Sequence, residues 1–156
     1  MSYDLMVFRK EAAPTTRTEF MKWYDEQTEW TEDHGYDDPA NTSPELQNWF
    51  SEMIKTFPAM NGPFASDDDD DSPYVTDYSI GNNVIYAAFS WSLTEQAYDL
   101  MLKLAEKHKV GFFDTSSDNG DILFPDNGKL KSIDNRTNTS SDSTNEQENK
   151  SWWKFW

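Results

Sequence analysis

The spacing of hydrophobic and polar positions predicts a strand followed by a helix at the start of the chain. Residues 3–8, YDLMVF, form a short apolar run that is typical of a buried strand. A helix is expected to begin after Thr16, because Thr16 and Glu19 have the spacing of a capping box. The helical period then selects positions of which only one is polar: Phe20, Trp23, Tyr24, Gln27 and Trp30.

A second helix is predicted from Ser43, which precedes Pro44 in the order favoured at a helix N-terminus. Its apolar positions keep the helical period throughout: Leu46, Trp49, Phe50, Met53, Ile54 and Phe57. This helix should end before Pro58. The following segment, 58–73, contains three prolines and five consecutive aspartates, and we expect a long loop there.

Two strand-like runs, 74–80 and 83–91, flank a Gly-Asn pair, which favours a hairpin because both residues tolerate positive φ. A third helix is expected from the capping-box pair Ser92 and Glu95 to about Lys109. Beyond it, VGFFDT at 110–115 and DILFP at 121–125 read as two short strands around a polar turn.

The expected element order is therefore βααββαββ. Such an order predicts the α+β class, with an antiparallel-dominated sheet and helices packed on one face. Without the second helix and the last strand, it would be the ferredoxin-like, split βαβ arrangement.

The chain of 156 residues is expected to form one domain over residues 1–128. Residues 129–150 are polar and lack apolar periodicity, so we expect a disordered linker there. The aromatic tail at 151–156, SWWKFW, could dock on its own domain or on a partner.

Charge narrows the range of partners. The chain has 13 Lys and Arg against 29 Asp and Glu, a net charge of −16. Residues 25–72 alone contain fourteen acidic residues and a single cation, Lys55. A surface of this sign repels nucleic acid and anionic lipid and attracts basic proteins. We therefore expect a basic protein partner, and neither nucleic acid binding nor stable membrane association.

Other features bear on compartment and chemistry. The sequence contains no cysteine, so it has neither a disulfide framework nor a thiolate nucleophile. The first ten residues do not have the pattern of a signal peptide, and no apolar run approaches the length of a membrane span. These observations favour a cytoplasmic protein.

No catalytic motif is present, so we expect a non-enzymatic protein without cofactor or metal. One alternative is a metal-dependent enzyme or metalloprotein that uses His34 with Asp33, Asp37 and Asp38. His108 is expected to have a structural role at the end of the third helix. Residues 114–126 resemble a calcium loop only superficially, since the first and last ligand positions hold the wrong residues.

Binding to a protein partner is the leading hypothesis. Acidic side chains would speed association with a basic partner, and aromatic side chains would supply the contacts that hold it. The alternative for the five aspartates is a solvated loop. The candidate partner-binding residues are Asp33, Tyr36, Asp37, Asp38, Asp67, Asp68, Asp69, Asp70, Asp71, Tyr74, Trp152, Trp153 and Trp156. A general interaction module that docks through its SWWKFW tail is a further alternative.

Several segments together resemble a group of small acidic bacterial proteins. They are SYDLMVF, FMKWYDEQTEW, EDHGYDDP, LQNWFSEMIKTFPAMNGP, TDYSIGNNVIYAAFSWS and LAEKHKVGFFD, and the resemblance covers roughly residues 2–125. Some members of the group are similar to immunity proteins of polymorphic-toxin and contact-dependent inhibition systems. The resemblance implies a cytoplasmic inhibitor of a basic toxin, which acts by occupying the toxin's active site or a neighbouring surface. It implies no catalytic residues.

Overall fold

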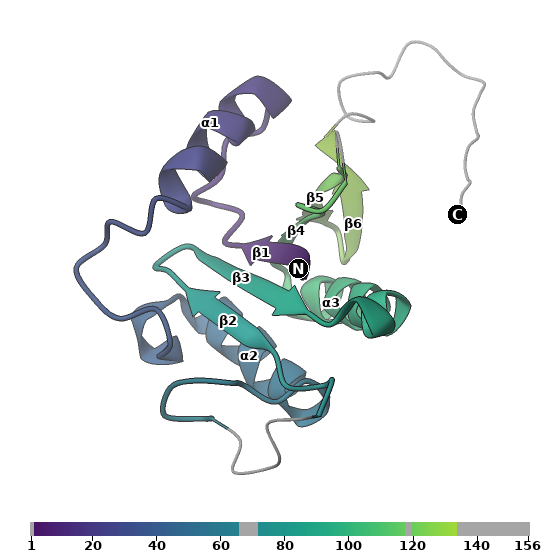
Figure 1. Cartoon of the computed structure of the whole chain (residues 1–156). Coiled ribbons are helices and arrows are strands. Elements are labelled where there is room, and N and C mark those ends of the chain that lie inside the picture. The colour runs from purple at the N-terminus through teal and green to yellow at the C-terminus, as the bar shows by residue number, and fades with distance from the viewer. Residues whose placement is uncertain (1, 66–71, 118–119, 134–156) are drawn as a thin grey trace.

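The computed structural model describes residues 2–65, 72–117 and 120–133 (Figure 1). In these residues a six-stranded antiparallel sheet has the strand order β2-β3-β1-β4-β5-β6. The strands are β1 (Tyr3–Phe8), β2 (Asp77–Ile80), β3 (Val84–Phe89), β4 (Gly111–Phe113), β5 (Ile122–Asp126) and β6 (Lys129–Ser132). The helices are α1 (Arg17–Gln27), α2 (Pro44–Thr56) and α3 (Thr94–His108), with 3-10 turns at Pro39–Asn41 and Trp91–Leu93. The predicted α+β class and the antiparallel sheet are confirmed.

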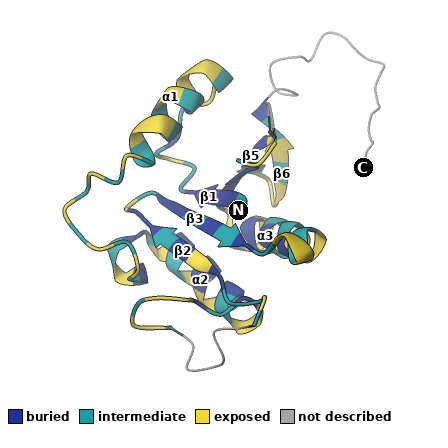
Figure 2. Ribbon diagram, in the orientation of Figure 1, coloured by how far each residue is buried: buried dark blue, intermediate teal, exposed yellow. Residues whose placement is uncertain are grey.

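The helices lie on both faces of the sheet, so the expectation that they share one face was wrong. Successive side chains of β1 point to opposite faces. Leu5 and Val7 belong to the core beneath α2 and α3, whereas Met6 and Phe8 belong to a second core beneath α1. All four side chains are fully buried. The uninterrupted apolar run of β1 therefore reflects a strand that is covered on both sides (Figure 2).

The larger core lies between the sheet and the helices α2 and α3. α2 begins where the sequence predicts, with the Ser43 hydroxyl accepting a hydrogen bond from the Leu46 amide at 3.4 Å. Its inward face then buries Leu46, Trp49, Phe50 and Met53. α3 contributes Ala97, Met101, Leu104 and Ala105 to the same core.

The smaller core is aromatic and fixes α1 to the opposite face. The N-cap at Thr16 is present, with its hydroxyl accepting from the Glu19 amide at 3.4 Å. Phe20 is fully buried and contacts Phe8 and Phe113, at ring-centroid distances of 5.1 and 5.2 Å. α1 thus depends on one central aromatic residue, flanked by the partly buried Trp23 and Tyr24.

The order of elements differs from the expected one because β6 follows β5. β6 occupies 129–132, a stretch predicted as the start of the disordered linker. Asn127 and Gly128 both have positive φ, of 54° and 80°, as a tight hairpin turn requires. The observed order is βααββαβββ, and the buried Ile133 belongs to the smaller core.

The start of α3 also differs from the prediction. The expected capping box of Ser92 and Glu95 is not formed, and Leu93 is the N-cap residue without a side-chain hydrogen bond. Instead, the Ser90 hydroxyl accepts from the Ser92 amide and caps the short turn Trp91–Leu93. This turn leaves Trp91 at the surface, with 49% of its area exposed.

Candidate protein-binding edge of the sheet

Strand β2 forms one end of the sheet, and two loops lie against its outer side. The Ile80 amide donates to the Tyr36 carbonyl at 2.7 Å. Just before the strand, the Met60 amide donates to the Thr76 carbonyl at 2.9 Å, and the Thr76 amide donates to the Pro58 carbonyl. We call this surface the acidic edge, and define it as residues 29–38, 58–65 and 76–80. Its loops satisfy the backbone groups that an edge strand otherwise leaves open.

The two loops of the acidic edge also touch each other. Gly62 has φ of +89°, and a Cβ atom at this position would lie 2.0 Å from the Asp37 carbonyl oxygen. Only glycine permits this approach. The loop 58–65 therefore meets the first loop where Gly62 lies against Asp37. Asp67, Asp68, Asp69, Asp70 and Asp71 themselves lie outside the described residues.

The acidic side chains of the edge differ in what they contact. Asp33 and Asp37 are exposed, whereas Asp38 accepts a hydrogen bond from the Ala40 amide at 2.9 Å and caps the turn Pro39–Asn41. Asp77, which the sequence analysis missed, adds an exposed carboxylate on β2. The alternation of β2 explains it, since Tyr78 and Ile80 face the core and Asp77 faces outward.

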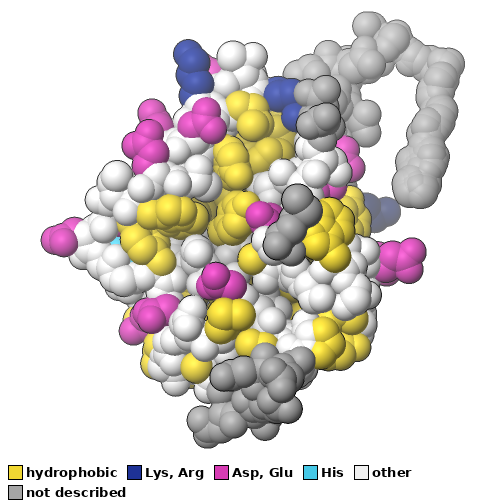
Figure 3. All heavy atoms as spheres, viewed as in Figure 1, with side chains coloured by type: hydrophobic (Ala, Val, Ile, Leu, Met, Phe, Trp, Pro, Cys, Tyr) yellow, Lys and Arg dark blue, Asp and Glu magenta, His cyan; other side chains and the backbone are white. Residues whose placement is uncertain are grey.

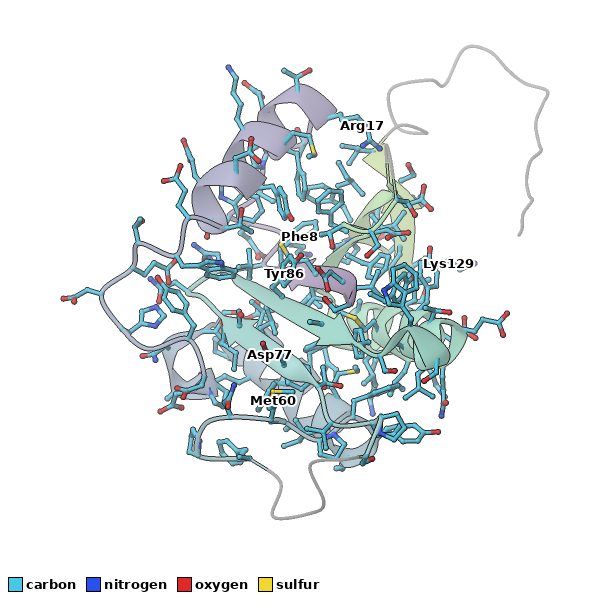
Figure 4. The ribbon with its side chains drawn as sticks, viewed as in Figure 1. Phe8, Arg17, Met60, Asp77, Tyr86 and Lys129 are labelled. Carbon is cyan, nitrogen blue, oxygen red and sulfur yellow. The ribbon has the colours of Figure 1, made fainter. Side chains whose placement is uncertain are left out.

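Two exposed apolar side chains, also missed, lie in the second loop of the acidic edge. Met60 is 51% exposed and Phe64 is 54% exposed. The backbone hydrogen bond from Met60 to Thr76 brings Met60 beside β2, and Figure 4 shows it next to Asp77. Phe64 closes a shallow hollow of about 210 Å³ over α2, with Phe50 beneath it. Apolar side chains and carboxylates therefore share one surface, as the space-filling view shows for this face (Figure 3).

The predicted aromatic residues have mainly internal contacts. The Tyr36 hydroxyl accepts from the Glu32 amide at 2.6 Å, and its ring packs against Trp30 and His34. Tyr74 lies outside the acidic edge, where its hydroxyl donates to Gln96 of α3 at 3.1 Å. Trp152, Trp153 and Trp156 lie outside the described residues.

His34 holds Glu32, and Glu32 fixes the first loop to the hairpin. The Nε2 atom of His34 lies 2.6 Å from Glu32 Oε1, and its Nδ1 lies 2.5 Å from the Gly35 carbonyl oxygen. The same Glu32 oxygen accepts from the Asn82 amide, in the turn between β2 and β3, at 2.9 Å. Asp33, Asp37 and Asp38 do not join this arrangement. In the part of the chain that the structure describes, no three His, Cys, Asp or Glu side chains are placed to hold a metal ion.

His108 lies at the end of α3, where a structural role was expected. Its Nε2 lies 2.5 Å from Glu52 Oε2, and Lys107 Nζ lies 3.0 Å from the other oxygen of the same carboxylate. Lys107 and His108 lower the pKa of Glu52 below its usual value through these hydrogen bonds. The three side chains join the end of α3 to α2.

The contacts of His34 predict a measurable pH dependence. Hydrogen bonds to the Gly35 carbonyl and to Glu32 raise the pKa of His34 above 6.5. A raised pKa in the folded state means that the stabilisation is fully present below the unfolded pKa and is lost as pH rises through the folded pKa. We expect a His34 NMR titration midpoint above 6.5, and a lower midpoint in Glu32→Gln.

The free energy of unfolding should follow the same sign. The difference between wild type and Glu32→Gln should be larger at about pH 5.5 than at about pH 8.5. The resonances of His108, which lies against Glu52, provide an internal control for the substitution. An unchanged His34 midpoint in Glu32→Gln would show that this pair does not form in solution.

None of the helices in the described residues combines the length and the apolar character that crossing a bilayer requires.

Comparison of the chain with models of known protein families, with curated proteins and with solved structures finds no match.

Proposed function

We propose that this protein is a non-enzymatic, cytoplasmic binding protein that recognises a basic protein partner through the acidic edge. The observation that carries the proposal is the exposure of Met60 and Phe64 in a loop that meets Asp37 at Gly62 and is hydrogen-bonded next to Asp77 at Thr76. The three segments of the acidic edge contain no lysine or arginine. A surface with apolar anchors inside a rim of one charge has the composition of a protein interface.

The two kinds of side chain have different roles in this proposal. The carboxylates steer a basic partner and raise its association rate, an effect that salt weakens. Met60 and Phe64 are exposed by half and lose contact with water only when a partner covers them. Affinity would therefore depend on Phe64, and the rate of association on the carboxylates.

The resemblance to immunity proteins extends the proposal to the kind of partner. We propose that the partner is the basic catalytic domain of a toxin. Its cationic groove, built to hold phosphates, would accept the carboxylates of the acidic edge. A metal-dependent enzyme at His34 is not proposed, because both of its ring nitrogens already have protein partners.

We also propose that part of the molecule corresponds to the ferredoxin-like, split βαβ arrangement. Strands β1 to β4 with α2 and α3 give the order βαββαβ, the composition of a split βαβ unit. In this interpretation α1 is the added helix, whereas the sequence pattern predicted α2 as the added one. α1 and the strands β5 and β6 would then be extensions of that unit.

Affinity capture from source-cell extract tests the function, with the full chain as bait. The expected result is a basic protein that is released when salt is raised from about 0.1 to 0.5 M. Phe64→Ala should weaken binding of that purified protein at least tenfold, or about 1.4 kcal/mol. Asp33→Asn combined with Asp77→Asn should slow association at low salt and leave dissociation nearly unchanged.

The matched control neutralises two acids elsewhere. Glu106→Gln with Asp126→Asn removes the same charge from α3 and from the end of β5, and should bind as wild type does. Equal effects of the two double variants would show that net charge, not the acidic edge, directs binding. If the captured protein is a toxin, co-expression should restore growth. Its failure to do so would contradict the immunity role.

A further inference from the structure

A groove separates the start of β1 from the first half of α3, away from the acidic edge. It has a volume of about 710 Å³ and is lined by Tyr3, Thr94, Glu95, Tyr98, Asp99 and Leu102. Tyr3 is paired with Phe89 at the end of β3, so the groove lies where β3 leads to α3 (Figure 1). None of its lining residues belongs to the acidic edge.

Two aromatic rings, Tyr3 and Tyr98, line the groove, and a third, Trp91, packs against Tyr3. The ring centroids of Tyr3 and Trp91 are 5.3 Å apart, and half of the Trp91 surface is exposed. Tyr98 stands edge-on to the buried Phe112, with a centroid distance of 5.2 Å and an interplanar angle of 82°. The core therefore fixes the ring of Tyr98, and the pair of Tyr3 with Trp91 forms an aromatic surface near it.

The charged side chains that line the groove are both carboxylates. Glu95 and Asp99 are exposed and one helical turn apart on α3, so their carboxylates lie on the same face. Neither the Tyr3 hydroxyl nor the Tyr98 hydroxyl has a hydrogen-bond partner within residues 2–65, 72–117 and 120–133. Burial raises the pKa of both tyrosines, and the nearby charges of Asp114 and Asp99 raise that of Tyr3 further. The hydroxyls therefore remain neutral at physiological pH.

We propose that this groove binds an arginine side chain presented by a protein partner. A guanidinium group stacks on aromatic faces and pairs with carboxylates through two parallel hydrogen bonds. Aromatic rings and carboxylates both line this groove, and the hydroxyls of Tyr3 and Tyr98 can accept further N–H groups. A lysine ammonium is a point charge that cannot stack on an aromatic ring as a planar guanidinium does.

A protein is the expected source because the groove continues along the surface. A second hollow of about 320 Å³ shares Thr94 and Glu95 with it and reaches Gln96. Gln96 accepts the hydrogen bond from Tyr74. An extended segment could thus pass from Tyr74 along the first turns of α3, with its arginine in the groove.

The test uses the full chain and a capped peptide, acetyl-Gly-Arg-Gly-amide. NMR titration should give saturable shifts centred on Tyr3, Trp91 and Tyr98, with weaker binding as salt rises. The same peptide with citrulline in place of arginine has nearly the same shape without the charge, and should bind at least about tenfold more weakly. The same peptide with lysine in place of arginine should also bind more weakly than the arginine peptide.

A variant pair assigns the site. Glu95→Gln with Asp99→Asn should weaken binding of the arginine peptide about tenfold or more, because the guanidinium loses both carboxylate partners. Both side chains are exposed, so their replacement should leave the fold intact. Glu106→Gln with Asp126→Asn should bind as wild type does. Equal affinity for the citrulline peptide, shifts spread over all acidic surfaces, or no effect of the first pair would each overturn the proposal. These outcomes do not depend on whether the acidic edge binds a partner.

Discussion

Replacing Phe20 with alanine should destabilise the protein by about 3–5 kcal/mol, the range for removal of a buried aromatic ring. Phe20 is fully buried between α1 and the sheet. Its ring meets Phe8, Phe113 and Phe124 edge-on, at centroid distances of 5.1, 5.2 and 6.5 Å. The surrounding rings are held by strands and cannot collapse into the space, so the cavity should remain. Phe20 is the fully buried residue at the centre of the attachment of α1, which Trp23 and Tyr24 complete through Phe8 and Phe113.

Urea unfolding measures the effect directly. Lys22→Ala on the exposed side of α1 is the control and should change the free energy of unfolding by less than about 0.5 kcal/mol. Phe20→Leu keeps most of the apolar volume and should fall between the two. If Phe20→Ala were as mild as Lys22→Ala, α1 would not pack on the second face of the sheet, and the two-faced arrangement would be wrong.

Local patterns predict α1 and α2 well, because each helix has an N-cap side chain and an apolar stripe. Thr16 and Ser43 both accept the expected backbone hydrogen bonds. The same patterns do not predict on which face of the sheet each helix packs. That face depends on which side of β1 meets Phe20, and β1 is apolar on both sides, so its sequence does not distinguish the two faces.

The last strand was missed for a similar reason. β6 reads KLKS, in which only Leu130 and Ser132 are half-buried and both lysines are exposed. An edge strand is stabilised by its neighbour and is often charged, so its own composition looks like a linker. The useful signal was Asn127-Gly128, a pair that strongly favours a two-residue hairpin turn.

For the binding surfaces too, the sequence predicts the residues that a local pattern marks and not those that only the fold brings together. The charge of residues 29–38 is visible in the sequence, and Asp33 and Asp37 are exposed as expected. Met60 and Phe64 are single apolar residues in an irregular loop, where no period marks them as exposed. The groove joins Tyr3 to Tyr98, which are brought together only by the sheet and α3.

Gly111→Ala should destabilise the protein by about 3 kcal/mol, at the upper end of the usual range for overpacking. Gly111 of β4 lies directly opposite Phe8 of β1. A Cβ atom there would lie 2.2 Å from both Cε2 and Cζ of the Phe8 ring. Phe20, Trp23 and Phe124 surround that ring, so it has no room to move away. Gly35→Ala, whose Cβ would meet only an ordinary contact at 3.5 Å, is the control and should cost less than about 1 kcal/mol.

A double-mutant cycle tests the cause of that loss. Leucine lacks the Cε and Cζ atoms that the new methyl group would strike, so Phe8→Leu should relieve the clash that Gly111→Ala creates. Phe8→Leu alone should cost about 1–3 kcal/mol. The double variant should be more stable than the sum of the single effects predicts, by at least about 1 kcal/mol, because the two residues share one contact. Strict additivity in urea unfolding would mean that the effect of alanine arises elsewhere in β4, and that Gly111 is not required by the close approach of the Phe8 ring.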